Sequence, residues 1–275
     1  MSWWGKLVGG AFGFMLGGPI GALLGAVLGH NFDRGLKSIP EEPGLDAGDR
    51  ERVQTAFFAA TFAVLGRVAK ADGRVSPEEI RMAEAVMDDM SLTADMRRMA
   101  IDLFNQGKSA DFDLDAVLRQ FRQECHGRTT LIVMFIEIQL QAAYADGRLD
   151  EAEDALLRRI CELLGLSELD YRRLERRVRV EHGFAGRGGR TGGGGSRASV
   201  SAKGPSLADA YAVLGVASDA SDADVKRSYR RLLSQHHPDK LVSKGLPEEM
   251  MKLASQKTHE IRQAYELIRE SRRDR

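Results

Sequence analysis

Hydrophobic positions follow several distinct patterns along the chain, and each pattern predicts a different kind of segment. Residues 7–29 contain no charged side chain, and this run is about as long as a helix that crosses a hydrocarbon core. Between residues 49 and 181, apolar positions recur at the spacing of amphipathic helices. The same period returns from residue 206. The predicted fold class is therefore all-α.

Changes in composition divide the chain into five predicted parts. A polar stretch contains Pro40, Pro43 and Gly44 and is typical of a spacer. A later stretch is rich in glycine, serine and arginine, and about 24 such residues have a root-mean-square reach of roughly 25–30 Å. The predicted parts are a membrane anchor at 1–36, a spacer at 37–50, a helical domain at 51–181, a flexible linker at 182–205 and a helical hairpin at 206–275.

Two amphipathic helices flank the tripeptide His237-Pro238-Asp239. The first has an apolar stripe of Val225, Tyr229, Leu232 and His236 and an opposite basic face of Lys226, Arg227, Arg230 and Arg231. Proline cannot continue a helix and favours an extended residue before it, so we expect the tripeptide in an inter-helix loop. Pro247 is expected to open the next helix, with the stripe Met250, Leu253, Lys257, Ile261, Ala264, Tyr265 and Ile268.

Signals before the basic helix complete this C-terminal pattern. Residues 207–216 predict a short helix stopped by Gly215, and Ser221 with Asp224 has the spacing of a capping box. Together with the tripeptide and residues 260–268, the ensemble resembles the J domain of the DnaJ/Hsp40 co-chaperones. The chain lacks the glycine/phenylalanine-rich segment and the cysteine-rich zinc repeats of full-length DnaJ, so independent client holding is not expected.

The resemblance to J domains implies a binding role. In that family, the basic helix and the tripeptide dock on ATP-bound Hsp70 and stimulate its ATP hydrolysis. The basic face would steer the chain toward an acidic partner surface. His236 is expected to pack between helices and to stand outside the Hsp70-binding set. By resemblance, that set is His237, Pro238, Asp239, Lys226, Tyr229, Arg230 and Arg231.

The middle part contains a weak internal duplication. Residues 71–79 and 145–153 share an Ala-Asp-Gly-Arg start, and each copy lies between two predicted helices, which predicts two helix-turn-helix units. The region resembles the TerB-like helical domain of tellurite-resistance proteins. With the apolar start and the J-like end, the order of parts resembles membrane-anchored DnaJ-like co-chaperones.

The repeated turn admits both a metal-binding and a capping interpretation. A calcium loop would place Val68 and Lys70 where carboxylates are needed. Ser76 with Glu79 and Asp150 with Glu153 instead have capping-box spacing. We therefore predict no metal site and keep metal binding as the minor alternative, with Asp72, Glu79, Asp146 and Glu153 as its ligands.

Glycine recurs at every fourth position of the apolar start. Such a register forms a groove that suits the close crossing of two membrane helices, so a homodimer in the lipid is predicted, with loose packing as the alternative. The predicted dimerisation residues are Gly9, Gly13, Gly17, Gly21 and Gly25. Trp3 and Trp4 precede the run at the expected interface. The run is long for a signal peptide and lacks an Ala-x-Ala site, so an uncleaved anchor is favoured.

Charge and cysteine content narrow the remaining possibilities. The 40 basic residues balance the 40 acidic residues, so no global field favours nucleic acid. Arginines of the linker admit contact with anionic lipid or nucleic acid, but a soluble tether is preferred. Cys125 and Cys161 lie in apolar helical patterns and are expected as buried free thiols, which suits a reducing compartment.

These observations predict a membrane-anchored Hsp70 co-chaperone without enzyme activity or a cofactor. Flanking charges leave the orientation open, but an Hsp70 partner places the C-terminal domains in the cytoplasm and the short N-terminus outside a bacterial inner membrane. The alternatives are an envelope scaffold and a metal-sensing adaptor in which the J-like part only docks.

Overall fold

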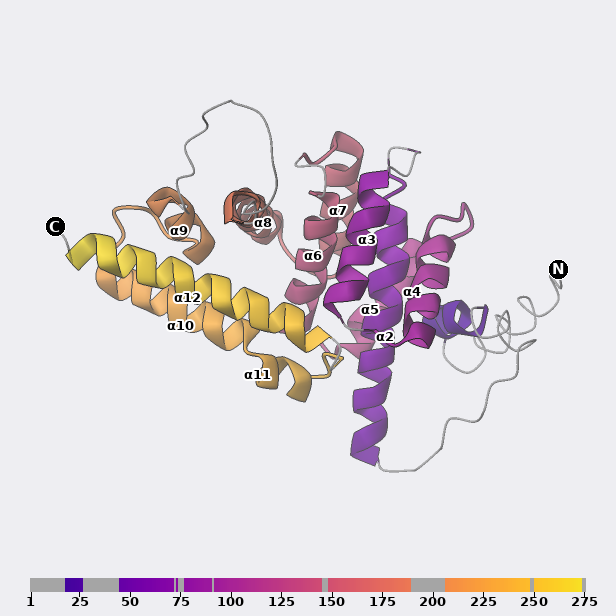
Figure 1. Cartoon of the computed structure of the whole chain (residues 1–275). Helices are drawn as coiled ribbons and strands as arrows, with labels where there is room; N and C mark the ends of the chain where they lie inside the picture. Colours follow the sequence, from indigo (N-terminus) through magenta and orange to yellow (C-terminus); the bar gives the residue numbers. More distant parts are fainter. Residues whose placement is uncertain are drawn as a thin grey trace.

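The computed structural model describes residues 18–26, 45–71, 73, 77–90, 92–144, 148–188, 206–247 and 250–273. Within these ranges the regular elements are helices and no strand occurs. The all-α prediction is therefore confirmed. Figure 1 shows the helices as one bundle joined to a hairpin that carries the C-terminus.

The middle domain is a bundle in which α6 is enclosed by its neighbours. The middle of α6 is buried on all sides, as expected of a helix in a core. The second half of α2 is buried in the same way. The bundle consists of α2 (Leu45–Val68), α3 (Pro77–Asp89), α4 (Ala94–Gly107), α5 (Leu114–Glu124), α6 (Thr129–Ala143), α7 (Glu151–Leu163) and α8 (Glu168–Gly188).

Two glycines allow α2 and α4 to cross at close range. A Cβ atom on Gly66 would overlap the backbone carbonyl of Phe104, and one on Gly107 would overlap the carbonyl of Ala63. Both positions therefore require the absence of a side chain. The middle domain therefore contains a close helix crossing through glycines, between α2 and α4. The crossing predicted for the N-terminal segment is a separate one.

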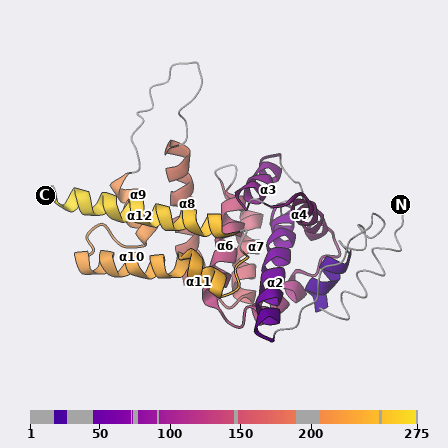
Figure 2. The ribbon, with the colours of Figure 1, turned by 60° about the horizontal axis from the view of Figure 1, so that its bottom comes forward.

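The C-terminal domain is a helical hairpin with a short helix across one end. Figures 1 and 2 show α10 (Asp222–His236) and α12 (Met251–Arg273) side by side, with α9 (Leu207–Leu214) near the C-terminus. The hairpin core contains residues of the predicted stripes, namely Val225, Leu232, Ile261, Ala264 and Ile268. Arg272 closes this end by donating to the hydroxyl of Tyr211 at 2.9 Å and to the carbonyl of Ala220 at 2.8 Å.

Several helix ends differ from the sequence-based boundaries. α2 begins at Leu45, inside the predicted spacer, and α8 continues to Gly188, inside the predicted linker. α12 begins at Met251 and not at Pro247, and the amide of Met250 donates to the carbonyl of Pro247 at 3.0 Å just before it. Helix ends of this kind are set by local capping geometry, which hydrophobic spacing does not report.

The hairpin packs directly on the bundle. Apolar residues of α11 (Pro238–Ser243), of the turn after it and of the start of α12 join the same core as the middle domain; they are Leu241, Leu246, Met250, Leu253 and Ala254. α8 contributes to both cores, since Val178 lies in the bundle core and Val180 packs against the hairpin core. The sequence-based prediction places the hairpin beyond a flexible linker and does not include this contact with the bundle.

The described part of the N-terminal segment is a helix at residues 18–26. Its Ile20 amide donates to Gln120 Oε1 at 2.7 Å, and Gln106 donates to the Leu23 carbonyl at 3.3 Å. Gly21 and Gly25 lie in this helix, whereas Gly9, Gly13 and Gly17 lie outside the described residues. Among the described helices, none combines the length and the apolar character needed to span a membrane.

Candidate functional site

The tripeptide His237-Pro238-Asp239, called the trigger below, lies where α10 ends and α11 begins. His237 is extended, with φ −63° and ψ 122°, and Pro238 is in the first turn of α11. The Leu241 amide donates to the His237 carbonyl at 3.0 Å. The predicted loop is therefore wrong for Pro238 and Asp239, because the fixed φ of proline suits the first position of a helix as well as a turn.

The side chains of the trigger differ in exposure, since Asp239 is exposed and His237 and Pro238 are half-buried. The side chain of Asp239 is 86% exposed and that of His237 is 44% exposed. His237 Nδ1 and Asp239 Oδ2 are 3.9 Å apart, which is too long for a hydrogen bond. The Asp239 carboxylate is thus available to a partner, whereas the Nδ1 atom of His237 is itself buried.

The basic face of α10 is exposed beside the trigger. Lys226, Arg230 and Arg231 all lie at the surface, as the pattern predicts. Tyr229 differs, since its ring is half-buried and stacks on Tyr265 with centroids 4.0 Å apart. The structure thus brings the predicted Hsp70-binding residues to one region, with Tyr229 also serving the hairpin packing.

His236 is the residue before the trigger, and it is buried against the middle domain. Its Nδ1 lies 3.6 Å from Glu137 Oε2 on α6, while the other oxygen of Glu137 pairs with Arg177 on α8. Thr258 on α12 donates to the His236 carbonyl at 3.0 Å. The prediction that His236 packs between helices is confirmed, but its side-chain partner comes from outside the hairpin.

Burial sets the protonation state of His236. Loss of hydration lowers its pKa well below the ordinary histidine value, and the nearby charges of Arg177 and Lys257 lower it further. The ring is therefore neutral at pH 7. At 3.6 Å its contact with Glu137 is a polar contact and not a full ion pair.

Sequence reasoning missed Glu137 and Arg177. Glu137 is the one acid in the apolar run of α6 and is 1% exposed. A buried carboxylate needs a charged or hydrogen-bonding partner, so its isolation in that run was an available signal. Its partners could not be identified from spacing, because they lie on α8 and α10.

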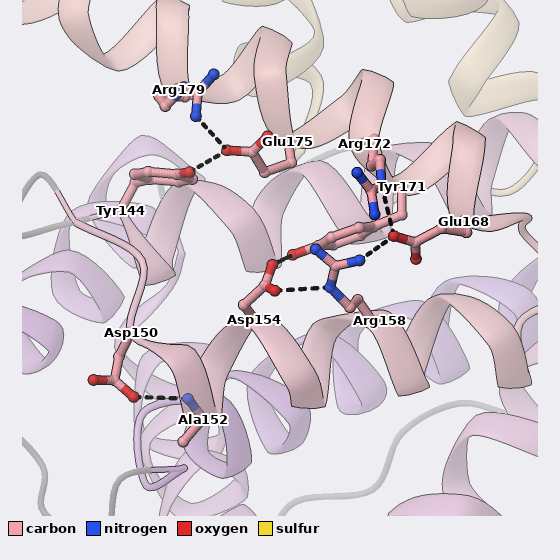
Figure 3. A network of polar contacts seen from close by, with 10 residues as sticks. All are labelled: Tyr144, Asp150, Ala152, Asp154, Arg158, Glu168, Tyr171, Arg172, Glu175 and Arg179. Carbon is pink, nitrogen blue, oxygen red and sulfur yellow. Dashed lines mark hydrogen bonds and ion pairs between the residues drawn. The ribbon is translucent and has the colours of Figure 1, made fainter.

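A polar network fixes α8, and so Arg177, on the bundle. Figure 3 shows Asp154 on α7 between two partners: the Tyr171 hydroxyl donates to it at 2.5 Å and Arg158 Nε donates at 2.7 Å. Burial raises the pKa of Asp154, but these two hydrogen bonds outweigh burial and leave the pKa below its usual value. Further along α8, Glu175 accepts from the Tyr144 hydroxyl.

The second copy of the duplicated turn is a helix cap in this structure. The Asp150 carboxylate accepts from the Ala152 amide at 2.8 Å, and Glu153 accepts from the Asp150 amide at 3.0 Å. Both carboxylates therefore serve the start of α7. Within the described ranges no three histidine, cysteine or acidic side chains form a metal-binding group. Asp72, Asp146 and the side chain of Glu79 lie outside the described part.

The two cysteines are buried and unpaired, as predicted. Burial raises the pKa of both the Cys125 and the Cys161 thiol to about 12. They are therefore poor nucleophiles at neutral pH.

Comparisons with known proteins cover all parts of the chain. Residues 1–39 match the model of the co-chaperone DjlA transmembrane domain, residues 58–176 match that of tellurite resistance protein TerB, and residues 209–275 match the DnaJ domain. The chain is 44% identical to co-chaperone protein DjlA of Photobacterium profundum over 279 residues, which cover 98% of this chain and 99% of that protein.

Relatives from other bacteria give the same result. Co-chaperone protein DjlA of Coxiella burnetii is 45% identical over 275 residues, and that of Escherichia coli K12 is 44% identical over 277 residues, each with 99% of both chains covered. The chain belongs to the DjlA family of co-chaperones. Its hairpin is a J domain, its bundle is a TerB-type domain, and the N-terminal match assigns that segment to the membrane anchor of the family. No solved structure matched the chain.

Proposed function

We propose that this protein docks on an Hsp70 of the DnaK type and stimulates its ATP hydrolysis, without hydrolysing ATP itself. The observation that supports this most strongly is the open trigger beside an exposed basic helix face. Asp239 presents its carboxylate to solvent and the His237 side chain is 44% exposed, and Lys226, Arg230 and Arg231 present positive charge on the same hairpin. Such a face speeds encounter with an acidic partner surface, and Asp239 is placed to accept from a partner cation.

An ATPase assay with the full chain in detergent micelles tests this proposal. His237→Gln or Asp239→Asn should reduce stimulation of the Hsp70 by roughly tenfold or more, as expected when a charged contact is truncated. Asp219→Asn is the matched control, because Asp219 is exposed in the turn before α10 and away from the trigger. Trigger variants that stimulate as well as the control would refute the assignment.

We further propose that residues 1–36 anchor the chain in a bacterial inner membrane as a dimer, with the C-terminal domains in the cytoplasm. This proposal rests on the apolar run, its glycine register and the match to a transmembrane domain. Replacing Gly13, Gly17 and Gly21 by leucine should keep the chain in membranes but strongly reduce cross-linking there, because bulky side chains hold the helices apart. Undiminished cross-linking would place any dimer contact elsewhere.

A further inference from the structure

The two ends of the trigger are held by the middle domain. On one side, His236 lies against Glu137 of α6. On the other side, Leu241 is fully buried in the core that the bundle shares with α11. The three trigger residues between these anchors remain open to solvent or half-buried.

The contact continues beyond Leu241. Arg128 donates to the Lys244 carbonyl at 2.6 Å, and Lys244 Nζ donates to Thr130 Oγ1 at 2.9 Å. Gly245 lies against Val53 of α2. These residues, with His236, Leu241 and Glu137, form what we call the interdomain contact. It combines apolar burial with directional hydrogen bonds, so it fixes one orientation of α11 on the bundle.

Charge makes this contact depend on Glu137. The carboxylate is 1% exposed and divides its oxygens between Arg177, itself 12% exposed, and His236. Loss of the carboxylate charge would remove this buried ion pair and weaken the packing of α6, α8 and α10 around it. This disfavours the arrangement in which the hairpin is packed on the bundle, called closed below.

We propose that Glu137 is a positioning residue for the trigger: by holding His236 while the bundle core holds Leu241, the middle domain sets the conformation in which the J domain meets Hsp70. The inference rests on the proposed function. Pro238 restricts the backbone of His237, and the carbonyls of His236 and His237 are already bonded to Thr258 and Leu241. A fixed His236 therefore leaves the trigger few alternative shapes, which lowers the ordering cost of binding.

An alternative hypothesis is that the middle domain masks the trigger and prevents Hsp70 from binding. The exposure of Asp239 and of the basic face of α10 argues against it. In the closed arrangement Asp239 is 86% exposed and the basic residues of α10 remain at the surface. The interdomain contact thus leaves the Asp239 carboxylate and the basic face of α10 uncovered.

The first experiment measures the interdomain contact without Hsp70. Thr130→Cys and Lys244→Cys introduce a pair for a short bis-maleimide. They replace one hydrogen-bonded pair of the contact in every chain that is compared, and the native thiols are buried. In the full chain in micelles, Glu137→Gln should lower the cross-linked fraction by roughly tenfold, because it removes one partner of a buried pair. Glu137→Asp should restore part of the yield. Asp115→Asn is the matched control, since Asp115 is a 31% exposed carboxylate of the middle domain that pairs with Arg159.

The second experiment measures ATPase stimulation by the same chains without the added cysteines. Glu137→Gln should lower the maximal stimulation about threefold to tenfold, because the trigger loses its preorganised shape. The concentration for half-maximal stimulation should change less than twofold, because α10 keeps its basic face. Glu137→Asp should recover part of the maximum, and Asp115→Asn should match the unmodified chain.

The outcomes separate this inference from the proposed function. If the unmodified chain stimulates Hsp70 and Glu137→Gln opens the contact without lowering the maximum, the positioning role is wrong while the proposed function stands. A higher maximum for Glu137→Gln would likewise overturn positioning and indicate masking. If the unmodified chain and His237→Gln are equally inactive, the proposed function fails first. An unchanged cross-linked fraction would show that Glu137 does not hold the contact.

Discussion

The two sides of the J domain differ in what covers them. The side formed by the basic face of α10 is exposed and charged, whereas the side formed by His236, Leu241 and the start of α12 is buried against the bundle. His236 and His237 mark the boundary, since one is 3% exposed in its side chain and the next is 44% exposed. The two adjacent histidines thus differ in environment: His236 is packed against the bundle, whereas the His237 side chain is partly exposed.

Burial on only one side has an energetic consequence. Contacts on the covered side are desolvated. A substitution there is therefore expected to alter the equilibrium between the closed arrangement and an open one, in which the J domain has separated from the bundle. Charges on the exposed side are hydrated and screened, so a change there is expected to alter mainly the encounter rate. Three predictions follow this order, from the covered side to the exposed side.

Gly245→Ala should disrupt the packing of the J domain on the bundle. A Cβ at this position would lie 2.6 Å from Val53 Cγ1, and overpacking of this kind costs about 1–3 kcal/mol of the closed arrangement. Val53→Ala in the same chain removes Cγ1 but keeps the Val53 Cβ at 2.9 Å from the added atom, so it should restore only part of this free energy, as measured by the cross-linked fraction of the Thr130→Cys, Lys244→Cys pair. Because Gly245 has φ +100°, the melting temperature of the J domain should fall in both variants. Equal cross-linking of the single and the double variant would show that the clash is not the cause.

Acid should weaken the same contact. In the closed arrangement burial lowers the pKa of His236, whereas a hydrated histidine in the open arrangement titrates near its ordinary value of about 6.5. The open arrangement therefore binds more protons below about pH 6.5, and closure loses up to about 1.4 kcal/mol for each further unit of pH. The charged groups that face His236 are Glu137 of α6, Arg177 of α8 and Lys257 of α12.

Spin labels at positions 130 and 244 measure this effect as the population of the short distance between pH 7.5 and pH 5.5. His259→Gln is the control, since His259 is exposed on α12 and contacts Gln263. A population that is constant over this range would contradict the assigned role of His236 titration.

Neutralising arginines on the exposed face of α10 should have the smallest effect of the three changes, and that effect should be on Hsp70 binding. Arg230→Gln together with Arg231→Gln should weaken Hsp70 binding by about 1 kcal/mol at low salt, because exposed charges each contribute little. The dependence of binding on ionic strength should flatten. Arg227→Gln is the control, since Arg227 pairs with Asp224 at 2.9 Å on the same helix. Unchanged salt dependence would move the docking surface away from α10.

The local features of the chain were accessible from its sequence. The α10 stripe of Val225, Leu232 and His236 is buried as its spacing predicts, and the Asp150–Glu153 box caps α7. The sequence-based predictions were wrong where one local signal is compatible with two structures. Pro238 fits a loop and a first helical turn equally well, and glycine-rich composition at 182–205 does not reveal that α8 reaches Gly188.

The sequence by itself determined the helices, the two apolar stripes of the J domain and the position of the trigger, because helix period, capping and proline act within a few residues of the chain. Only the tertiary structure decided that His236 is buried against Glu137, about a hundred residues earlier, and that Arg177 shares the same carboxylate. Pairings of this kind depend on how three helices approach one another. Spacing along one helix gives the face on which a residue lies, but it does not identify the charged residue of another helix that packs against that face.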